Sequence, residues 1–193
     1  VSGLYAAVVI HYMGLRPDIL VKLADSRFVV ELGAALVTAS LAAVAAFCAG
    51  TPGRPIWQRL APMPALAIWL ASLGQGCWQS WIRSGPSGLE IWPDPICFPS
   101  IVLAGAVPGA LILWMIRKGA PMAPITTTAL ASLAAAALGA AALRLFHPQD
   151  ASVMILVWQV GSVAVLTMLG AASGRFFLRW TTGSARHGTA QGR

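Results

Sequence analysis

Charged residues are scarce in this chain of 193 residues. Only 10% of them are charged, whereas 58% are hydrophobic, and the mean hydropathy is +0.74. A soluble domain carries about a quarter charged residues and just under half apolar ones, so this chain has too little polar surface to cover a water-soluble globule. The shortage of charge excludes an ordinary soluble domain and predicts an integral membrane protein.

Patterns that would indicate catalysis are also missing. The chain has 3 histidines, and no two of them have a helical spacing suited to haem. The sequence contains no Ser-His-Asp pattern, no phosphate-binding loop, no HExxH and no carboxylate at mid-depth of an apolar segment. We therefore expect no enzymatic activity, and the lack of cofactor ligands disfavours a membrane-bound redox enzyme.

Long apolar segments are abundant, and they predict an all-α, polytopic membrane helix bundle with six transmembrane helices. Each apolar segment is bounded by Gly, Pro or charged residues. The first is too short to cross a bilayer alone, so we expect it to be part of a truncated span. Residues 1–180 then form the membrane domain, and the polar residues 181–193 a disordered cytoplasmic tail. The six segments are Val1–Met13, Phe28–Ala49, Met63–Trp81, Pro99–Ile116, Ile125–Leu143 and Val153–Leu178.

The charged residues divide unevenly between the two sides of this bundle. Eight of the 13 basic residues and none of the 6 acidic ones fall on the side that carries both chain ends. Because basic residues gather in cytoplasmic loops, both termini are predicted to be cytoplasmic. The net charge of +7 is thus interpreted as topology, and we expect no direct nucleic-acid partner. On this side, Arg54, Arg59, Arg117 and Lys118 could contact an acidic partner surface or anionic lipids of the bilayer.

Small residues and tryptophans refine the helix bundle. The segment Ile125–Leu143 is rich in Ala and Gly, so we expect it to be central. The pairs Gly105/Gly109 and Gly170/Gly174 have the GxxxG spacing that lets helices approach closely, and a homodimer through such a face is left open. Tryptophans near the segment ends predict interfacial belts on both sides, with Trp57, Trp114 and Trp180 on the cytoplasmic side and Trp78, Trp81 and Trp92 on the other.

Two of the three cysteines share the outer, non-cytoplasmic side. Cys77 and Cys97 lie at the outer ends of consecutive predicted helices, whereas Cys48 lies near the cytoplasmic end and is expected to be a buried structural thiol. The outer thiols could be a redox-active or metal-sensing pair that binds a heavy metal transiently. They could also form a structural disulfide or be unrelated free thiols.

Further polar residues surround these thiols in the sequence. Gln75 and Gln79 are four residues apart on one helical face, where they could form a polar shell around Cys77 or hydrogen-bond between helices. At the next outer connection, Arg144, His147 and Asp150 resemble the turn Arg16-Pro17-Asp18. In each turn the aspartate could cap the following helix or favour its positive N-terminal end, or the charges could form a salt-bridged turn. Together with Arg27 and Glu31, these charges could form an outer cluster. His147 could titrate near neutral pH or add a nitrogen ligand.

The order of several short motifs resembles the NrsF family, from Val1 to Trp180. This resemblance implies a six-span bacterial inner-membrane protein that acts as a negative regulator, an anti-sigma factor, of a SigF-type extracytoplasmic-function sigma factor. The motifs are Met13–Asp18, Leu23–Phe28, Leu70–Gly74 followed by Cys77, Cys97–Pro99, Arg117–Pro121 and Leu143–Pro148.

The resemblance also implies a signal and a mechanism. The family is associated with heavy-metal and oxidative stress, and a cysteine pair implicated in sensing corresponds here to Cys77 and Cys97. Family members carry a polar cytoplasmic segment before the first span, which we expect to be missing from this sequence. The alternative is a small metal or solute transporter or channel, which would need polar residues along a path at mid-depth.

Overall fold

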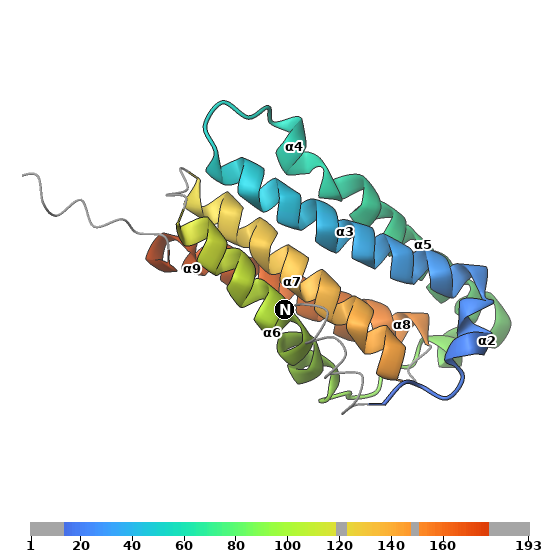
Figure 1. Ribbon diagram of the computed structural model, residues 1–193. Helices are drawn as coiled ribbons and strands as arrows, with labels where there is room; N and C mark the ends of the chain where they lie inside the picture. Colours follow the sequence, from blue (N-terminus) through green and yellow to red (C-terminus); the bar gives the residue numbers. More distant parts are fainter. Residues whose placement is uncertain (1–13, 119–122, 148–150, 178–193) are drawn as a thin grey trace, which may run out of the picture.

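A computed structural model of the chain describes residues 14–118, 123–147 and 151–177 (Figure 1). Every regular element in these ranges is a helix, which confirms the all-α fold class. Five helices are long and apolar enough to cross a membrane. The predicted first segment, Val1–Met13, and the predicted tail, residues 181–193, lie outside the described residues.

The five long helices run alternately between the two ends of one bundle. They are α3 (Ser26–Gly50), α5 (Pro62–Ser84), α6 (Cys97–Arg117), α7 (Pro124–Phe146) and the continuous run of α8 (Ser152–Met154), η2 (Ile155–Val160) and α9 (Gly161–Phe177). Short helices occupy the connections: α2 (Ile19–Leu23), α4 (Trp57–Leu60) and η1 (Gly85–Leu89). The helix ends agree with the predicted segments to within about three residues.

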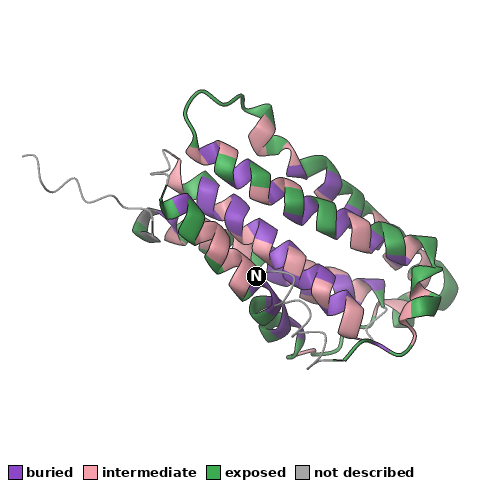
Figure 2. Cartoon of the chain, in the orientation of Figure 1, coloured by how far each residue is buried: buried purple, intermediate pink, exposed green. Residues whose placement is uncertain are grey.

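Helix α7 is the centre of the bundle, as its small residues predicted. It packs against α3, α6 and α9, and 61% of its most apolar stretch is buried, compared with 28% for α6. Figure 2 shows the buried residues following α7 along its length. Helix α5 lies outside this group and packs against α3. Although α5 and α6 are consecutive, they do not form a packed hairpin, because α6 packs against α7 instead.

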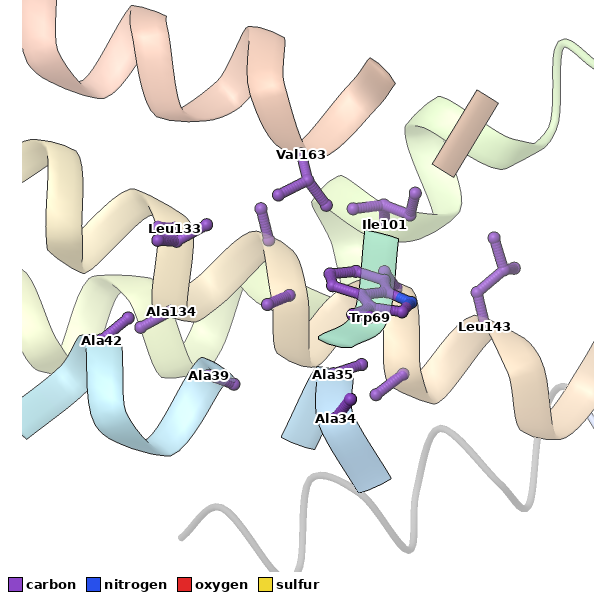
Figure 3. Packing of buried hydrophobic residues seen from close by; sticks show 14 of the residues in the cluster. Ala34, Ala35, Ala39, Ala42, Trp69, Ile101, Leu133, Ala134, Leu143 and Val163 are labelled. Atoms are coloured by element: carbon purple, nitrogen blue, oxygen red, sulfur yellow. The ribbon is translucent and has the colours of Figure 1, made fainter. Parts of the chain in front are cut away.

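The core is made mostly of alanine, so the helices lie close together. Ala35 and Ala39 of α3 are buried with Ala137 and Ala140 of α7 in one cluster. Trp69 of α5 is the one aromatic ring labelled in Figure 3, and it belongs to the same cluster. Small side chains allow this approach where no hydrophobic drive exists between membrane helices.

Both GxxxG pairs are used inside the chain. A Cβ at Gly105 would lie 2.6 Å from the backbone oxygen of Ala135 of α7, and one at Gly109 would lie 3.0 Å from the Ala135 Cβ. A Cβ at Gly174 would lie 2.8 Å from the backbone oxygen of Pro124, the first residue of α7. The two glycine faces therefore let α6 and α9 pack closely against α7.

The surface of the bundle matches a lipid environment. Large apolar side chains are exposed on several helices, including Leu103 of α6, which is 66% exposed, and Met168 of α9, which is 70% exposed. The described tryptophans of the two predicted belts, Trp57 and Trp114 at one end and Trp78, Trp81 and Trp92 at the other, are all exposed. Such rings settle at the membrane interface, so their positions agree with a bundle that spans the bilayer.

Candidate functional site

The two ends of the bundle differ in charge. The described acidic residues all lie where α3, α6 and α8 begin and α5 and α7 end, and we call this the acidic end. We call the opposite end, with α4 and the last residues of α6, the basic end. In the described part of the basic end, the charged residues are all Arg or Lys.

A buried charge network lies within the acidic end. Arg27 Nε donates to one carboxylate oxygen of Glu31 at 3.0 Å, and Arg144 Nη2 donates to the other at 2.9 Å. Glu31 is 4% exposed and Arg144 is 7% exposed. Arg27 also donates a hydrogen bond to Ser152 at the start of α8. Because buried charges are costly unless they are paired, this network fixes α3, α7 and α8 relative to one another.

Helix α5 closes on this network through a glycine. A Cβ built on Gly76 would collide with the Arg27 guanidinium and with Ser152 Oγ. A Cβ built on Gly74, two residues earlier in α5, would meet open space. Gly76 is therefore the position at which α5 lies against the Arg27 side chain, and the residue that follows it is Cys77.

A second cluster joins three other segments at the same end. Asp94 precedes α6, Cys97 is the first residue of α6, and His147 directly follows α7. Cys97 Sγ donates a hydrogen bond to Asp94 Oδ2 at 3.1 Å, and His147 Nε2 is 2.8 Å from the same oxygen. One ligand atom from each residue lies within 4.8 Å of the other two. Their thiol, imidazole and carboxylate are the side chains that bind metal ions in proteins.

The loop before α6 is held in place by the last span. The backbone N–H of Trp92 donates to Met154 Sδ at 3.3 Å, and Trp158 Nε1 donates to the Trp92 carbonyl at 3.0 Å. Met154 ends α8 and Trp158 lies in η2, whose π-helical turn widens the helix at this point. The loop therefore places Asp94 beside the end of α7.

The Asp94 carboxyl responds to these neighbours. Burial by itself raises the pKa of Asp94. The hydrogen bonds from Cys97 and His147, the charge of His147 and the hydrogen bond from the Ile96 N–H lower it. These lowering effects are together larger, so the pKa lies below its ordinary value. The carboxylate is thus ionised at neutral pH, and it accepts hydrogen bonds at both oxygens.

The segment before α2 is attached to the end of α7. Arg16 makes a two-pronged ion pair with Asp18, with Nε and Nη2 at 2.7 and 2.8 Å from the carboxylate oxygens. The backbone N–H of Arg16 donates to the carbonyl of Leu145 at 3.0 Å. Asp18 is the N-cap residue of α2, but its carboxylate makes no side-chain cap hydrogen bond and pairs with Arg16, which confirms the salt-bridged turn.

One comparison with known proteins decides the family. The family model of NrsF, described as "Negative regulator of sigma F", matches residues 2–180. The chain belongs to the NrsF family. Comparison with curated proteins and with solved structures found no significant match.

The two outer cysteines of this NrsF protein lie in different surroundings. Cys77 and Cys97 are both free thiols, so the structural disulfide considered above is not present. Cys97 is buried and bonded to Asp94, whereas Cys77 is partly buried on α5, where the charges that act on it are those of Arg27 and Glu31. The cluster around Asp94 does not include Cys77. Cys48 is also only partly buried, so the expectation of a buried thiol is wrong there.

The other residues predicted at the acidic end fall into different places in the structure. Arg27, Glu31 and Arg144 come together as expected, and His147 joins the neighbouring cluster. Gln75 is exposed on α5 and Gln79 is partly buried. Two grooves of the NrsF bundle, of about 180 and 360 Å³, are lined almost entirely by apolar residues. Asp150 lies outside the described residues.

The basic end of the NrsF protein presents its charges to the surroundings. Arg54, Arg117 and Lys118 are exposed, and Arg59 is partly buried. Lys118 Nζ lies 3.8 Å from the centroid of the Trp114 ring, which is a cation–π contact typical of an exposed interfacial site.

Three residues of the acidic end were missed by reasoning from the sequence. Ser152 had no signal, because its role depends on Arg27 more than a hundred residues away. Gly76 was hidden by the many other glycines of the apolar segments. Asp94 could have been found, since an acidic residue three positions before a cysteine that begins a helix can bring its carboxylate close to the thiol.

Proposed function

We propose that this protein is a membrane-embedded anti-sigma factor that sequesters an extracytoplasmic-function sigma factor and releases it on heavy-metal or oxidative stress. The observation that carries the proposal is the division of the bundle into two unlike ends. One end holds buried charges and two thiols, and the other presents exposed basic residues. The family description, negative regulator of sigma F, supports the class of partner.

In this proposal the acidic end faces the periplasm and the basic end faces the cytoplasm of a bacterial inner membrane. The exposed arginines and lysine of the basic end support this orientation, because such residues are retained on the cytoplasmic side. The sigma factor is cytoplasmic, so its contact surface includes Arg54, Arg59, Arg117 and Lys118. An acidic face on the partner would complement these charges.

The signal is received at the thiols of the acidic end, Cys77 and Cys97. Helices α3, α5, α6, α7 and α8 all contribute to the two clusters at this end. A metal or an oxidant that changes the bonding of either thiol changes the contacts between helix ends, and packed helices respond by shifting between discrete arrangements. The shift reaches the basic end through α7, which contacts three of the other spans.

Co-purification tests the proposal. The complete gene product is tagged and isolated from membranes with its sigma factor, before and after exposure of the cells to Cd²⁺ or an oxidant. We expect the wild type to hold the sigma factor and to lose most of it after stress, while the Cys77→Ser/Cys97→Ser double variant holds it in both conditions. Cys48→Ser, at the other end of the bundle, is the matched control and should release normally.

Two results would overturn the proposal. If no sigma factor co-purifies with the unstressed wild type, the protein is not an anti-sigma factor. If the double variant releases its partner as the wild type does, sensing does not depend on these thiols.

A further inference from the structure

We propose that Asp94, Cys97 and His147 together form a binding site for a divalent transition-metal ion such as Zn²⁺. A cysteine, a histidine and an aspartate offer the sulfur, nitrogen and oxygen ligands that Zn²⁺ takes in proteins, and three protein ligands with a water in the fourth position make a common arrangement. The biological meaning of this site rests on the proposed function, because the site names the ion and the ligands by which the acidic end would sense a metal.

The three ligand atoms already surround a common point. Both Cys97 Sγ and His147 Nε2 are hydrogen-bonded to the same oxygen, Asp94 Oδ2, at 3.1 and 2.8 Å. In a tetrahedral Zn²⁺ site the ligand atoms are about 3.4–3.6 Å apart, as its bond lengths require. All three atoms lie within 4.8 Å of one another, so small side-chain rotations suffice to bind the ion.

The chemistry of binding is a replacement of protons by the metal. The ion takes the place of the proton that Cys97 shares with Asp94, so the thiol becomes a thiolate and one proton leaves to the solvent. His147 binds through Nε2, so the proton that Nε2 donates to Asp94 also leaves this nitrogen, and the neutral ring keeps its one proton on Nδ1. Asp94 binds through its carboxylate oxygen Oδ2, to which the other two ligands are already hydrogen-bonded.

The site is both reachable and held in position. The side chains of Asp94 and His147 are 12% and 21% exposed, which leaves a way in for an ion, while Cys97 is buried beneath them. The backbone of Trp92 fixes the loop that carries Asp94 to the last span. Ligands on anchored segments can bind a metal without a large ordering cost.

Binding would tie the start of α6 to the end of α7. Two residues before His147, the carbonyl of Leu145 accepts the hydrogen bond from Arg16. The same turn of α7 carries Arg144, which is paired with Glu31 of α3. A metal at His147 therefore acts on the one helix end that also holds α3 and the segment before α2.

The test uses Co²⁺ as a spectroscopic substitute for Zn²⁺. Purified, metal-free protein in detergent micelles is titrated with Co²⁺, and the thiolate-to-metal charge-transfer band is recorded; Zn²⁺ then displaces Co²⁺ to give its affinity. We expect the wild type, Cys77→Ser and Cys48→Ser to bind one equivalent with the band intact. Cys97→Ser should lose the band, and Asp94→Asn and His147→Gln should each weaken Zn²⁺ binding by at least about tenfold.

Each other outcome contradicts the proposal. If Cys77→Ser abolishes the band while Asp94→Asn binds Zn²⁺ as tightly as the wild type, the metal is held by the two cysteines instead. If the wild type binds no stoichiometric Co²⁺, the site does not exist. Far-ultraviolet circular dichroism of each variant verifies folding, and the near-isosteric Asp94→Asn remains informative if another variant misfolds.

This result is independent of the anti-sigma assay. Retention of the sigma factor by metal-free protein tests the proposed function, and Co²⁺ binding tests the site. A protein that binds Co²⁺ as predicted but holds no sigma factor would refute the proposed function alone. A protein that holds its partner but binds no Co²⁺ would refute the metal site alone.

Discussion

The acidic and basic ends of this bundle are built in opposite ways. At the acidic end, Glu31 and Arg144 are buried and paired, and the connection before α6 is hydrogen-bonded to another span. At the basic end, Arg54 is exposed on the connection after α3, and Arg117 and Lys118 are exposed at the end of α6. The buried charges of the acidic end are thus used for bonds within the chain, and the exposed charges of the basic end are available to surroundings or partners.

This difference separates two physical roles. Buried, paired charges hold several helices in one arrangement, and changing a single bond disturbs all of them. Exposed charges of one sign contribute little to stability, but they attract partners of opposite sign. The first kind of end suits reception of a signal, and the second suits binding of a protein.

Breaking the buried network should have the largest effect. Replacing Glu31 by Gln leaves Arg27 and Arg144 without their carboxylate, and loss of one partner from a buried ion pair costs about 3–5 kcal/mol. The free energy of unfolding, measured by denaturant titration in detergent micelles, should fall by this amount. The control is Glu90→Gln at the same end, where the side chain is exposed. Equal stability of the two variants would show that the network does not hold the acidic end.

A pair of glycines in α5 gives a sharper, smaller effect. Gly76→Ala should destabilise the bundle by about 1–3 kcal/mol, because the new methyl group collides with Arg27 and Ser152. Gly74→Ala meets open space and should be neutral or stabilising by up to about 1 kcal/mol, since Ala favours the helix. Thermal unfolding of both variants makes the comparison. A Gly76→Ala protein as stable as Gly74→Ala would mean that α5 does not approach the network.

The pH dependence of stability should identify Asp94. Its pKa is lowered in the folded protein from an ordinary value of 3.8, so it contributes stability that is complete above that value and is lost as the pH falls through the lower, folded pKa. Asp94→Asn removes this contribution and should flatten the acid side of the unfolding profile below pH 4. If the stability of Asp94→Asn falls with pH below 4 as that of the wild type does, the group that titrates is not Asp94.

Neutralising the basic end should affect stability least. The triple variant Arg54→Ala/Arg117→Ala/Lys118→Ala changes exposed side chains only, and each such change costs within about 0.5 kcal/mol. Retention of the sigma factor should nevertheless fall, and wild-type retention should weaken as salt is added. Full retention by the triple variant would remove these residues from the partner surface.

Much of the bundle could be predicted from the sequence because its signals are local. Apolar length located the five described spans, and the Ala-rich composition identified α7 as central. The pairing of helices could not be predicted, since α5 and α6 are consecutive in the chain, yet α6 packs against α7. Because α6 packs against α7, Cys97 lies close to His147. The sequence placed Cys77 and Cys97 at the same end of the bundle, but it did not show that they have different neighbours.

The orientation of the two ends is the claim on which both reception and partner binding depend. It can be measured by introducing Glu90→Cys at the acidic end or Arg54→Cys at the basic end, each in a background where the three native cysteines are Ser. Both positions are exposed. A membrane-impermeant maleimide added to intact spheroplasts should label the Glu90→Cys protein at once and the Arg54→Cys protein only after the membrane is permeabilised. Labelling of Arg54→Cys, but not Glu90→Cys, in intact spheroplasts would contradict the account.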